Sequence, residues 1–470
     1  MRRYIIDIDF TKDNIVSYIE TFEQKFYPTF FRKETNEWIY LWYWNKEKEY
    51  SEFLDIIINQ KNKLVTIERD LKATLILFYY FDNTRLIVSS DYNYFVQHLD
   101  IKSMINEDFL KLELWHGKIT NTSICKNISI LYPRRKYIFQ WDKQEIIEMP
   151  YTFKPIQIED ILHQNFCNLN EYNKVGAEIS WGKDSAFLPI LAKKSHHSPF
   201  QFISWQLHTW EVWEEQRSTL WKIVQFLNIP YEYYLIKEED YPLKNELAGA
   251  IHHPVEEIYK NSVLWEIEVL KKNSINTVFN GFWGDEAFQD RNDMSIDFTD
   301  KSDEHLSFIF QESFIEDVRK LNSTSEYIHK DSIFQTSVYD ALICRNNLYI
   351  QNGIRPMTPY LNIDTYEYFQ SLKVKKQYFF NTFYNNFDPQ LQWAFDKNTN
   401  MSKYFEWFFK SEFFNNLLQA CLKQPSKISP YYNIDTIKKH FPHTPSCSDE
   451  LVDKYDFMLY KFVKMSLMLK

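Results

Sequence analysis

The sequence predicts a soluble α/β protein with two domains, and three observations support this prediction. The chain has 470 residues, which is enough for two or three domains, and its 44% apolar and 25% charged residues are typical of globular proteins. About the first 150 residues read mostly as short strands separated by turns, which indicates antiparallel sheets. From about residue 155 strands alternate with helices, which indicates a parallel, doubly wound sheet.

The N-terminal part carries clear hairpin patterns. The segment TLILFYYFDNTRLIVSSD reads as two strands joined by a turn at Asp82-Asn83. The segment NISILYPRRKYIFQWDKQEIIEM adds short strands, with turns predicted at Pro133 and at Asp142-Lys143. We therefore expect this part of the chain to form antiparallel sheets.

The second part repeats strands, loops and helices. After a helical pattern in IEDILHQNFCNLNEY, the run VGAEIS predicts a strand and SAFLPILAKK a helix. Further strands are predicted in FQFISWQL, YEYYLI and NTVFNG, with helices in EEQRSTLWKIVQFLNI and SVLWEIEVLKKNSI. From about residue 300 the sequence reads as largely helical and aromatic. Because doubly wound sheets bind ligands beyond the carboxyl ends of their strands, a site is expected there.

Charge and cysteine usage exclude several classes of protein. The net charge is −10 and no run of Lys and Arg stands out, so we expect no nucleic-acid partner. The longest apolar run is too short to cross a bilayer, and the first residues do not form a signal peptide. Five cysteines without metal-binding spacing suit a reducing compartment (Cys125, Cys167, Cys344, Cys421 and Cys447). These features predict a cytoplasmic protein with no membrane partner.

Glycine is scarce, and its positions are informative. The chain has only 7 glycines, whereas an average chain of this length would have roughly thirty. Three of them, Gly182, Gly281 and Gly284, lie in two short segments that each follow a predicted strand. The clustering favours loops where a side chain would obstruct a ligand, although ordinary turns in a glycine-poor chain are the alternative.

The first of these loops, ISWGKDS, has the chemistry of a phosphate site. It opens a predicted helix, whose free N–H groups and positive dipole end attract anions. Ser180 and Ser185 offer hydroxyl groups, and Lys183 offers a cation. Gly182 allows close backbone approach, and Asp184 is suited to hold Mg²⁺. Taken alone, the loop is equally well explained as a capped helix terminus.

The second loop, FNGFWGDEAF, strengthens the interpretation. Gly281 and Gly284 follow a predicted strand, and Asp285 comes directly after them. If the two strands are neighbours, Asp184 and Asp285 could share one metal ion. A solvated first helical turn remains the alternative for Asp285.

Three segments together resemble the asparagine-synthetase-like amide ligases. SWGKDS is similar to their pyrophosphate-binding loop, and NGFWGDEAF to their second glycine-rich segment. NGIRPMTPYLNIDTYEYFQSL is similar to a third family segment that follows in the same order. The N-terminal part resembles a glutaminase-type sandwich domain of the N-terminal-nucleophile kind, through the segments SSDYNYF, GKIT and NISILYPRRKYIF in that order. The resemblance implies a glutaminase-like domain at residues 1–154 and a pyrophosphate-loop (PP-loop) ATP pyrophosphatase-type synthetase domain at residues 155–470.

The resemblance also implies an activity and a site. Family members use ATP and Mg²⁺ to adenylate a carboxylate, which an amine then converts to an amide. Asp184 and Asp285 match the metal ligands, and Asp285 also counts among the catalytic residues. Lys397 matches best a late lysine that stabilises the intermediate, and Lys403 is second. The cofactor-binding positions implied by the two loops are Ser180, Trp181, Gly182, Lys183, Asp184, Ser185, Asn280 and Gly281.

The chain departs from the family pattern at several positions. Active glutaminase domains carry a cysteine after the initiator methionine, whereas this chain has Arg2, so we expect no glutamine hydrolysis. Phe282 stands where asparagine synthetases have a glutamate, and a phenylalanine side chain cannot transfer a proton. A base is therefore sought among Glu256, Glu257 and the tyrosines. Both loops also carry an indole in place of a glycine, at positions 181 and 283, and an asparagine stands at position 362 in place of a usual aspartate.

These departures favour the relatives that form β-lactams or close lasso peptides, since such enzymes take the amine from the substrate itself. The expected function is macrolactam formation on a peptide, with a precursor-processing protease as a possible partner. Two alternatives stay open. One is a non-catalytic paralogue that serves as a binding scaffold, and the other is an ammonia-using asparagine synthetase.

Overall fold

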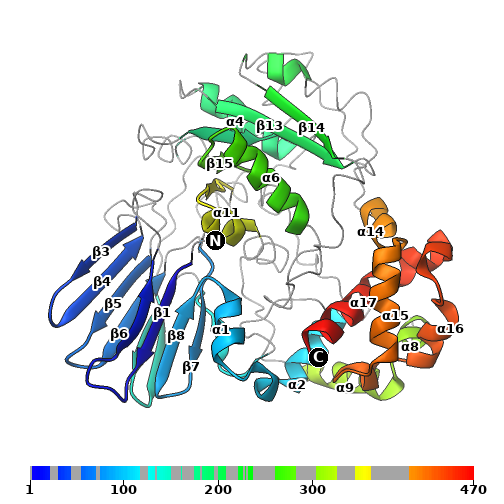
Figure 1. Cartoon of the computed structure of the whole chain (residues 1–470), viewed down its shortest axis with the longest axis horizontal. Coiled ribbons are helices and arrows are strands. Elements are labelled where there is room, and N and C mark those ends of the chain that lie inside the picture. The colour runs from blue at the N-terminus through cyan, green and yellow to red at the C-terminus, as the bar shows by residue number, and fades with distance from the viewer. Residues whose placement is uncertain are drawn as a thin grey trace.

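The structure is a computed structural model of a mixed α/β protein with several sheets, one of them parallel (Figure 1). It describes residues 3–21, 30–43, 54–69, 75–116, 125–132, 135–149, 160, 174–179, 183–194, 200–207, 221–225, 228, 231–236, 260–281, 303–324, 345–360 and 402–469. The predicted domain boundary after residue 154 and most of the helix predicted before residue 173 lie outside these ranges. In the helix predicted for EEQRSTLWKIVQFLNI, residues 221–225 are described and are helical.

Two antiparallel sheets form the N-terminal part, as the sequence predicts. The first has the order β2-β1-β8-β7-β9, and the second has the order β11-β10-β6-β5-β4-β3. The strands of the first sheet are β1 (Ile5–Asp9), β2 (Val16–Glu20), β7 (Phe78–Phe81), β8 (Arg85–Ser89) and β9 (Ile128–Ile130). Those of the second are β3 (Phe30–Glu34), β4 (Trp38–Tyr43), β5 (Leu54–Asn59), β6 (Leu64–Arg69), β10 (Arg135–Gln140) and β11 (Lys143–Glu148).

The predicted turns lie where hairpins join these strands. The β7–β8 turn contains Asn83 at φ 76°, and Oδ1 of Asp82 accepts hydrogen bonds from the backbone N–H groups of Thr84 and Arg85. The β10–β11 turn lies at residues 141–142, one residue earlier than predicted, because Gln140 and Lys143 are already paired. Asp142 supplies the positive φ of 60° there. The turn predicted at Pro133 lies outside the described residues.

The two sheets stack into a sandwich, and helices cover the other face of the first sheet. Because side chains alternate along a strand, β1 divides its apolar residues between two cores. Ile6 and Ile8 pack in the core shared with the second sheet. Ile5 packs on the opposite side in a core that includes residues of α1 (Tyr92–His98) and α2 (Glu107–His116). Figure 1 shows the first sheet lying between the second sheet and these helices.

The third sheet is parallel and has the order β14-β13-β12-β15-β16. Its strands are β12 (Val175–Glu178), β13 (Phe200–Leu207), β14 (Tyr231–Ile236), β15 (Thr277–Phe279) and β16 (Arg355–Met357). Phe279 shares a core with α4 (Lys183–Lys194), whereas its neighbour Val278 shares a core with α6 (Lys260–Lys272). Since adjacent residues of a strand face opposite sides, the two helices cover opposite faces of the sheet. The prediction of a parallel sheet in this part of the chain is confirmed.

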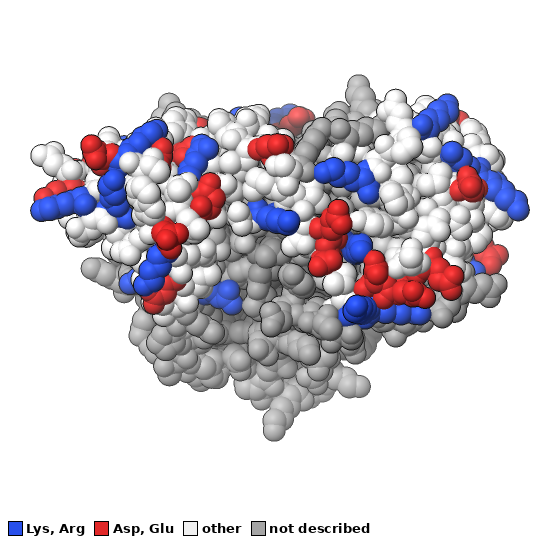
Figure 2. All heavy atoms as spheres, turned by 90° about the horizontal axis from the view of Figure 1, so that it is seen from below, with Lys and Arg blue, Asp and Glu red and all other residues white. Residues whose placement is uncertain are grey.

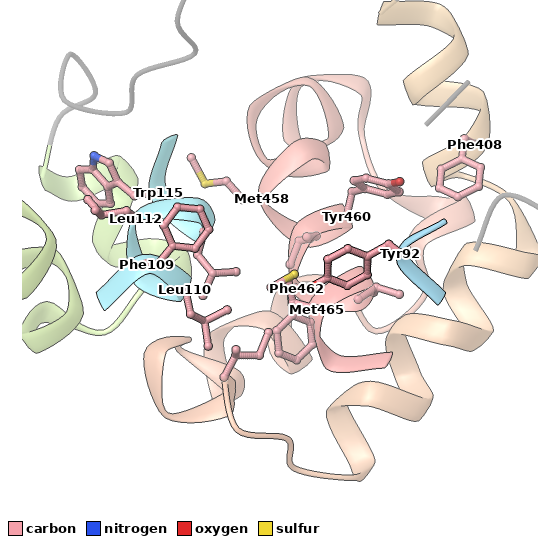
Figure 3. Packing of buried hydrophobic residues seen from close by; sticks show 14 of the residues in the cluster. Tyr92, Phe109, Leu110, Leu112, Trp115, Phe408, Met458, Tyr460, Phe462 and Met465 are labelled. Atoms are coloured by element: carbon pink, nitrogen blue, oxygen red, sulfur yellow. The ribbon is translucent and has the colours of Figure 1, made fainter. Parts of the chain in front are cut away.

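The C-terminal part is helical, as predicted. Its α-helices are α8 (Asp303–Ile309), α9 (Glu312–Thr324), α11 (Asn347–Gln351), α14 (Ser402–Phe409), α15 (Glu412–Lys423), α16 (Ile434–His440) and α17 (Asp449–Met468). Figure 3 shows side chains of α17 beside those of α2 in one apolar core, for example Met458 and Phe462 near Leu110 and Phe109. The end of the chain therefore packs on the N-terminal helices.

The described part of the face drawn in Figure 2 carries both acidic and basic side chains, with several acidic ones gathered at the lower right. Among the described residues, the exposed large apolar side chains are Tyr18, Phe31, Trp221 and three on the β10–β11 hairpin (Trp141, Ile146 and Ile147). Among the helices in the described ranges, none combines the length and the apolar character that a membrane crossing requires.

Candidate functional site

The candidate site lies where the order of the parallel sheet reverses. The chain runs from β12 to β13 and β14 on one side, and then returns to β15 and β16 on the other. β12 and β15 are neighbours in register, with Val175 opposite Thr277 and Ala177 opposite Phe279. Their carboxyl ends therefore lead into the two glycine-containing loops at one edge of the sheet. Ligands of doubly wound proteins bind at such a reversal point.

The first loop leads directly into a helix. β12 ends at Glu178, Ile179 is buried, and α4 begins at Lys183. The first turn of α4 contains Lys183, Asp184 and Ser185, and Ser185 is buried. The N-terminal N–H groups of a helix have no partners within the helix and carry its positive dipole end. The strand and the helix predicted on either side of this loop are thus present, and the positive end of α4 follows the carboxyl end of β12 after only four residues of chain.

The second loop begins at a buried asparagine. Asn280 is 1% exposed, and its backbone N–H donates to the carbonyl oxygen of Met357 over 3.1 Å. Gly281 follows and is half-buried. This hydrogen bond ties the end of β15 to the end of β16, so the start of the second loop has a fixed place at the sheet edge.

The third segment that resembles the amide ligases also lies here. Its residues Arg355–Met357 form β16, which is parallel to β15 and pairs Arg355 with Thr277. The backbone N–H of Arg355 donates to the carbonyl oxygen of Asn276 over 2.8 Å. All three segments therefore leave the sheet on β12, β15 and β16, which are consecutive strands. Sequence reasoning did not predict β16, because the strand has three residues, one of them proline, and no alternating pattern.

A buried polar group next to this edge was also missed by sequence reasoning. Tyr349 on α11 and Glu266 on α6 are both fully buried. Burial raises the pKa of Tyr349 well above its usual value, and the carboxylates of Glu266 and Glu178 raise it further, while Arg345 acts in the opposite direction. The hydroxyl group stays protonated at neutral pH and lies near carboxylates from α6 and β12. A single tyrosine in a helical pattern gives no signal for this arrangement.

Several predicted site residues lie outside the described residues: Ser180, Trp181, Gly182, Asp285, Lys397, and with them Glu256, Glu257, Phe282 and Trp283. The backbone of Asp184 and Lys183 is described, but their side chains are not, and the same holds for Lys403 in α14. Among the side chains that are described, no three His, Cys, Asp or Glu residues come together. The roles assigned to these residues stay predictions.

Comparisons with known proteins do not identify the family. No model of a known protein family matches the chain. No curated protein matches its sequence either. Among solved structures, the chain is similar to the U34-tRNA thiolase NcsA from Methanococcus maripaludis with its [4Fe-4S] cluster, at 12% identity and a TM-score of 0.26. That similarity covers 67% of this chain and 80% of the thiolase chain, and at this TM-score it carries no argument about function.

Proposed function

We propose that this protein is an ATP-dependent, AMP-forming ligase that joins a carboxylate to an amine, with a peptide as its substrate. The observation that carries the proposal is the adjacency of β12 and β15. Two loops with phosphate-binding and metal-binding residue types follow these neighbouring strands at the point where the sheet order reverses. The strands that lead into or begin the three segments resembling the PP-loop amide ligases (β12, β15 and β16) are consecutive in the sheet.

In this proposal the N-terminus of α4 binds the pyrophosphate portion of ATP. Backbone N–H groups and the helix dipole attract the phosphates, as does the ammonium group of Lys183. The hydroxyl groups of Ser180 and Ser185 donate further hydrogen bonds, and Gly182 leaves room for the phosphate oxygens. Asn280 and Gly281 form the opposite wall of the site.

The acidic residues of the two loops fit a magnesium site. Asp184 belongs to the first turn of α4, and Asp285 comes four residues after Gly281, so each carboxylate belongs to one of the two neighbouring loops. Carboxylate oxygens are the protein ligands that Mg²⁺ prefers. Bound there, Mg²⁺ would neutralise charge that accumulates on the pyrophosphate as it leaves.

The proposed reaction has two steps. A carboxylate oxygen of the substrate attacks the α-phosphorus of ATP, and the bond from that phosphorus to pyrophosphate breaks. An amine nitrogen then attacks the acyl carbon, the bond to AMP breaks, and the amine proton passes to a base. Lys397 is the proposed cation that stabilises charge in these steps, and Lys403 is its alternative. Glu256, Glu257 and the tyrosines are the candidate bases.

We assign the amine to the substrate and not to glutamine. Arg2 stands where the glutaminase resemblance has its cysteine, so this proposal does not take the amine from glutamine. When both the carboxylate and the amine belong to one peptide, the product is a macrolactam. A protease that trims the peptide precursor would then act before this enzyme, because it exposes the amine.

The test combines nucleotide binding with turnover. Calorimetry with ATP and Mg²⁺ measures binding, and release of AMP and pyrophosphate in the presence of a candidate precursor peptide measures the reaction. Asp184→Asn is expected to lower turnover by about 100-fold, since it removes a carboxylate that would hold the Mg²⁺ acting on the leaving pyrophosphate. The control Asp13→Asn changes an exposed turn residue in the N-terminal part and is expected to leave turnover unchanged.

The two alternatives give different results in the same assays. A binding scaffold neither binds ATP nor forms AMP, and the indoles at positions 181 and 283 are the feature that favours this reading. An asparagine synthetase forms AMP with aspartate in ammonium salts and needs no peptide. Peptide-dependent AMP formation without activity in aspartate and ammonium supports the proposed ligase.

A further inference from the structure

One buried asparagine connects the N-terminal sandwich to the helix that precedes β16. Asn347 is 4% exposed. Its Oδ1 accepts from the backbone N–H of Ile76 over 3.1 Å, and its Nδ2 donates to the carbonyl oxygens of Ile76 and Ser90 over 3.0 and 3.1 Å. Ile76 precedes β7, and Ser90 follows β8. One side chain therefore pairs backbone groups of two segments that lie more than 250 residues away in the sequence.

The helix that carries Asn347 belongs to both parts of the protein. Ile350 packs in the core of the sandwich. Leu348 and Tyr349 pack in a different core, with residues of α6 and β15. Gln351 adds a hydrogen bond from its Nε2 to the carbonyl oxygen of Ser90 over 3.3 Å. α11 is thus fixed on one side by the sandwich and on the other by the parallel sheet.

A short path leads from α11 to the candidate ATP site. α11 ends at Gln351, and Gly353 adopts a φ of 83° that turns the chain into β16. The last residue of β16, Met357, accepts the hydrogen bond from Asn280. Asn280 opens the second of the two loops. The position of this loop therefore depends on the position of β16, and β16 follows directly from α11.

From this geometry we infer that the N-terminal sandwich positions the candidate ATP site. Asn347 is the positioning residue: it fixes α11 to the sandwich, and α11 in turn fixes β16 and the start of the second loop. The inference rests on the proposed function for its effect on ATP. A buried amide that pairs three backbone groups suits this role, because a lost partner would leave polar atoms unpaired.

The test changes only the donating half of the amide. Asn347→Asp keeps an oxygen for the N–H of Ile76, but it places a carboxylate next to the carbonyl oxygens of Ile76 and Ser90. Hydrogen exchange of residues 277–281 and 354–360 is expected to rise by about tenfold or more, since local opening becomes easier. Residues 231–236, on the far edge of the same sheet, are expected to exchange at the wild-type rate.

A matched control makes the same change elsewhere. Asn433 also donates from Nδ2 to a backbone carbonyl oxygen, that of Ser307, over 3.4 Å, but both residues lie in the C-terminal helical part. Asn433→Asp is expected to leave exchange at residues 277–281 unchanged. If Asn347→Asp does not fold, Gln351→Ala removes the weaker bond to Ser90 and is expected to give a smaller rise in the same segments.

Nucleotide binding gives the second measurement. In Asn347→Asp, calorimetry should show ATP binding weakened by about tenfold, with the secondary structure unchanged by circular dichroism. If the wild-type chain binds no ATP, the proposed function fails, while hydrogen exchange still decides whether the sandwich positions the loop. The inference is overturned if exchange rises around Ile76 and Ser90 but stays at the wild-type rate in residues 277–281, or if it rises nowhere.

Discussion

Glu113 is a buried carboxylate between two helices that lie far apart in the sequence. Its side chain on α2 is 4% exposed, and its Oε1 lies 3.9 Å from Nζ of Lys461 on α17. The Lys461 ammonium group also donates to the Glu113 carbonyl oxygen. Burial raises the pKa of Glu113 to about 7, although the charges of Lys461 and Lys464 act in the opposite direction. The loss of hydration therefore outweighs the attraction of both lysines.

This pKa predicts that stability falls as the pH rises from about 5 to 7. In that range the folded chain keeps a proton on Glu113 that the unfolded chain has lost, because the ordinary value is 4.5. The free energy of unfolding should decrease by about 2 kcal/mol across the range. Urea unfolding at a series of pH values measures it. Glu113→Gln should flatten the dependence, whereas Glu107→Gln on the exposed side of α2 should keep it.

Asp7 and Arg85 form an ion pair with two hydrogen bonds in the first sheet of the sandwich. The Arg85 Nε and Nη2 atoms donate to the two carboxylate oxygens of Asp7 over 3.0 and 2.6 Å, and the Tyr94 hydroxyl group donates over 3.2 Å. The Asp7 side chain is 6% exposed, so without Arg85 its charge would be buried with little compensation. The side chain of Asp7 faces away from the second sheet, toward α1.

Arg85→Met is therefore expected to lower the free energy of unfolding by about 3 kcal/mol, measured by urea denaturation. Arg32→Met provides the comparison, because Arg32 pairs with Glu34 while both side chains are 43–50% exposed. Its expected effect is under about 1 kcal/mol. Similar losses in the two variants would show that burial does not set the strength of the Asp7 pair.

Elements with a strong local signal were predictable, and those fixed by distant contacts were not. The β7–β8 hairpin follows from an Asp-Asn turn whose residues tolerate its geometry. β12 and β15 follow from apolar runs that end in glycine-containing loops. β16 has no such signal, because its three residues form a strand only when β15 lies beside them. The sequence shows the glycine before this strand but not the strand itself.

That glycine gives a prediction for the connection between α11 and β16. Gly353 has a φ of 83°, and its N–H donates to the carbonyl oxygen of Ile350 over 3.0 Å. Gly353→Ala should lower the free energy of unfolding by about 1–2 kcal/mol, because a Cβ is strained in the left-handed region. Gly353→Asn should lose less, since asparagine tolerates this conformation. Thermal unfolding measures both, and equal losses would argue against backbone strain as the cause.

The assembly of the parts could not be read from the sequence. One apolar core includes residues of α1 and α2, of the parallel sheet and of the C-terminal helices. Some of its contacts join residues more than 300 positions apart. The hydrophobic pattern of a helix or strand shows which face is buried, but not which distant element packs against it. β12 and β15 are parallel neighbours, so their carboxyl ends lie at one edge of the sheet, which is where the sequence predicts a site. The side chains at that edge that would hold ATP stay predictions, since most lie outside the described residues.

A shared core predicts that the N-terminal and C-terminal parts unfold together. Trp115 on α2 is fully buried, and its ring lies 6.2 and 6.3 Å from the rings of Phe310 and Phe314, next to and within α9. Trp115→Ala should therefore destabilise both parts by about 3–5 kcal/mol, because it leaves a cavity between them.

Urea unfolding followed by circular dichroism should show one transition at a lower midpoint, and hydrogen exchange should rise in residues 107–116, 303–324 and 449–468 together. Trp141→Ala removes an indole that is 51% exposed and should change stability by less than about 0.5 kcal/mol. Two separate transitions, with the C-terminal helices unaffected, would mean that the two parts pack against each other but unfold independently. The positioning role inferred for the sandwich would then depend on α11 alone, because α2 and α9 would no longer connect the two parts energetically.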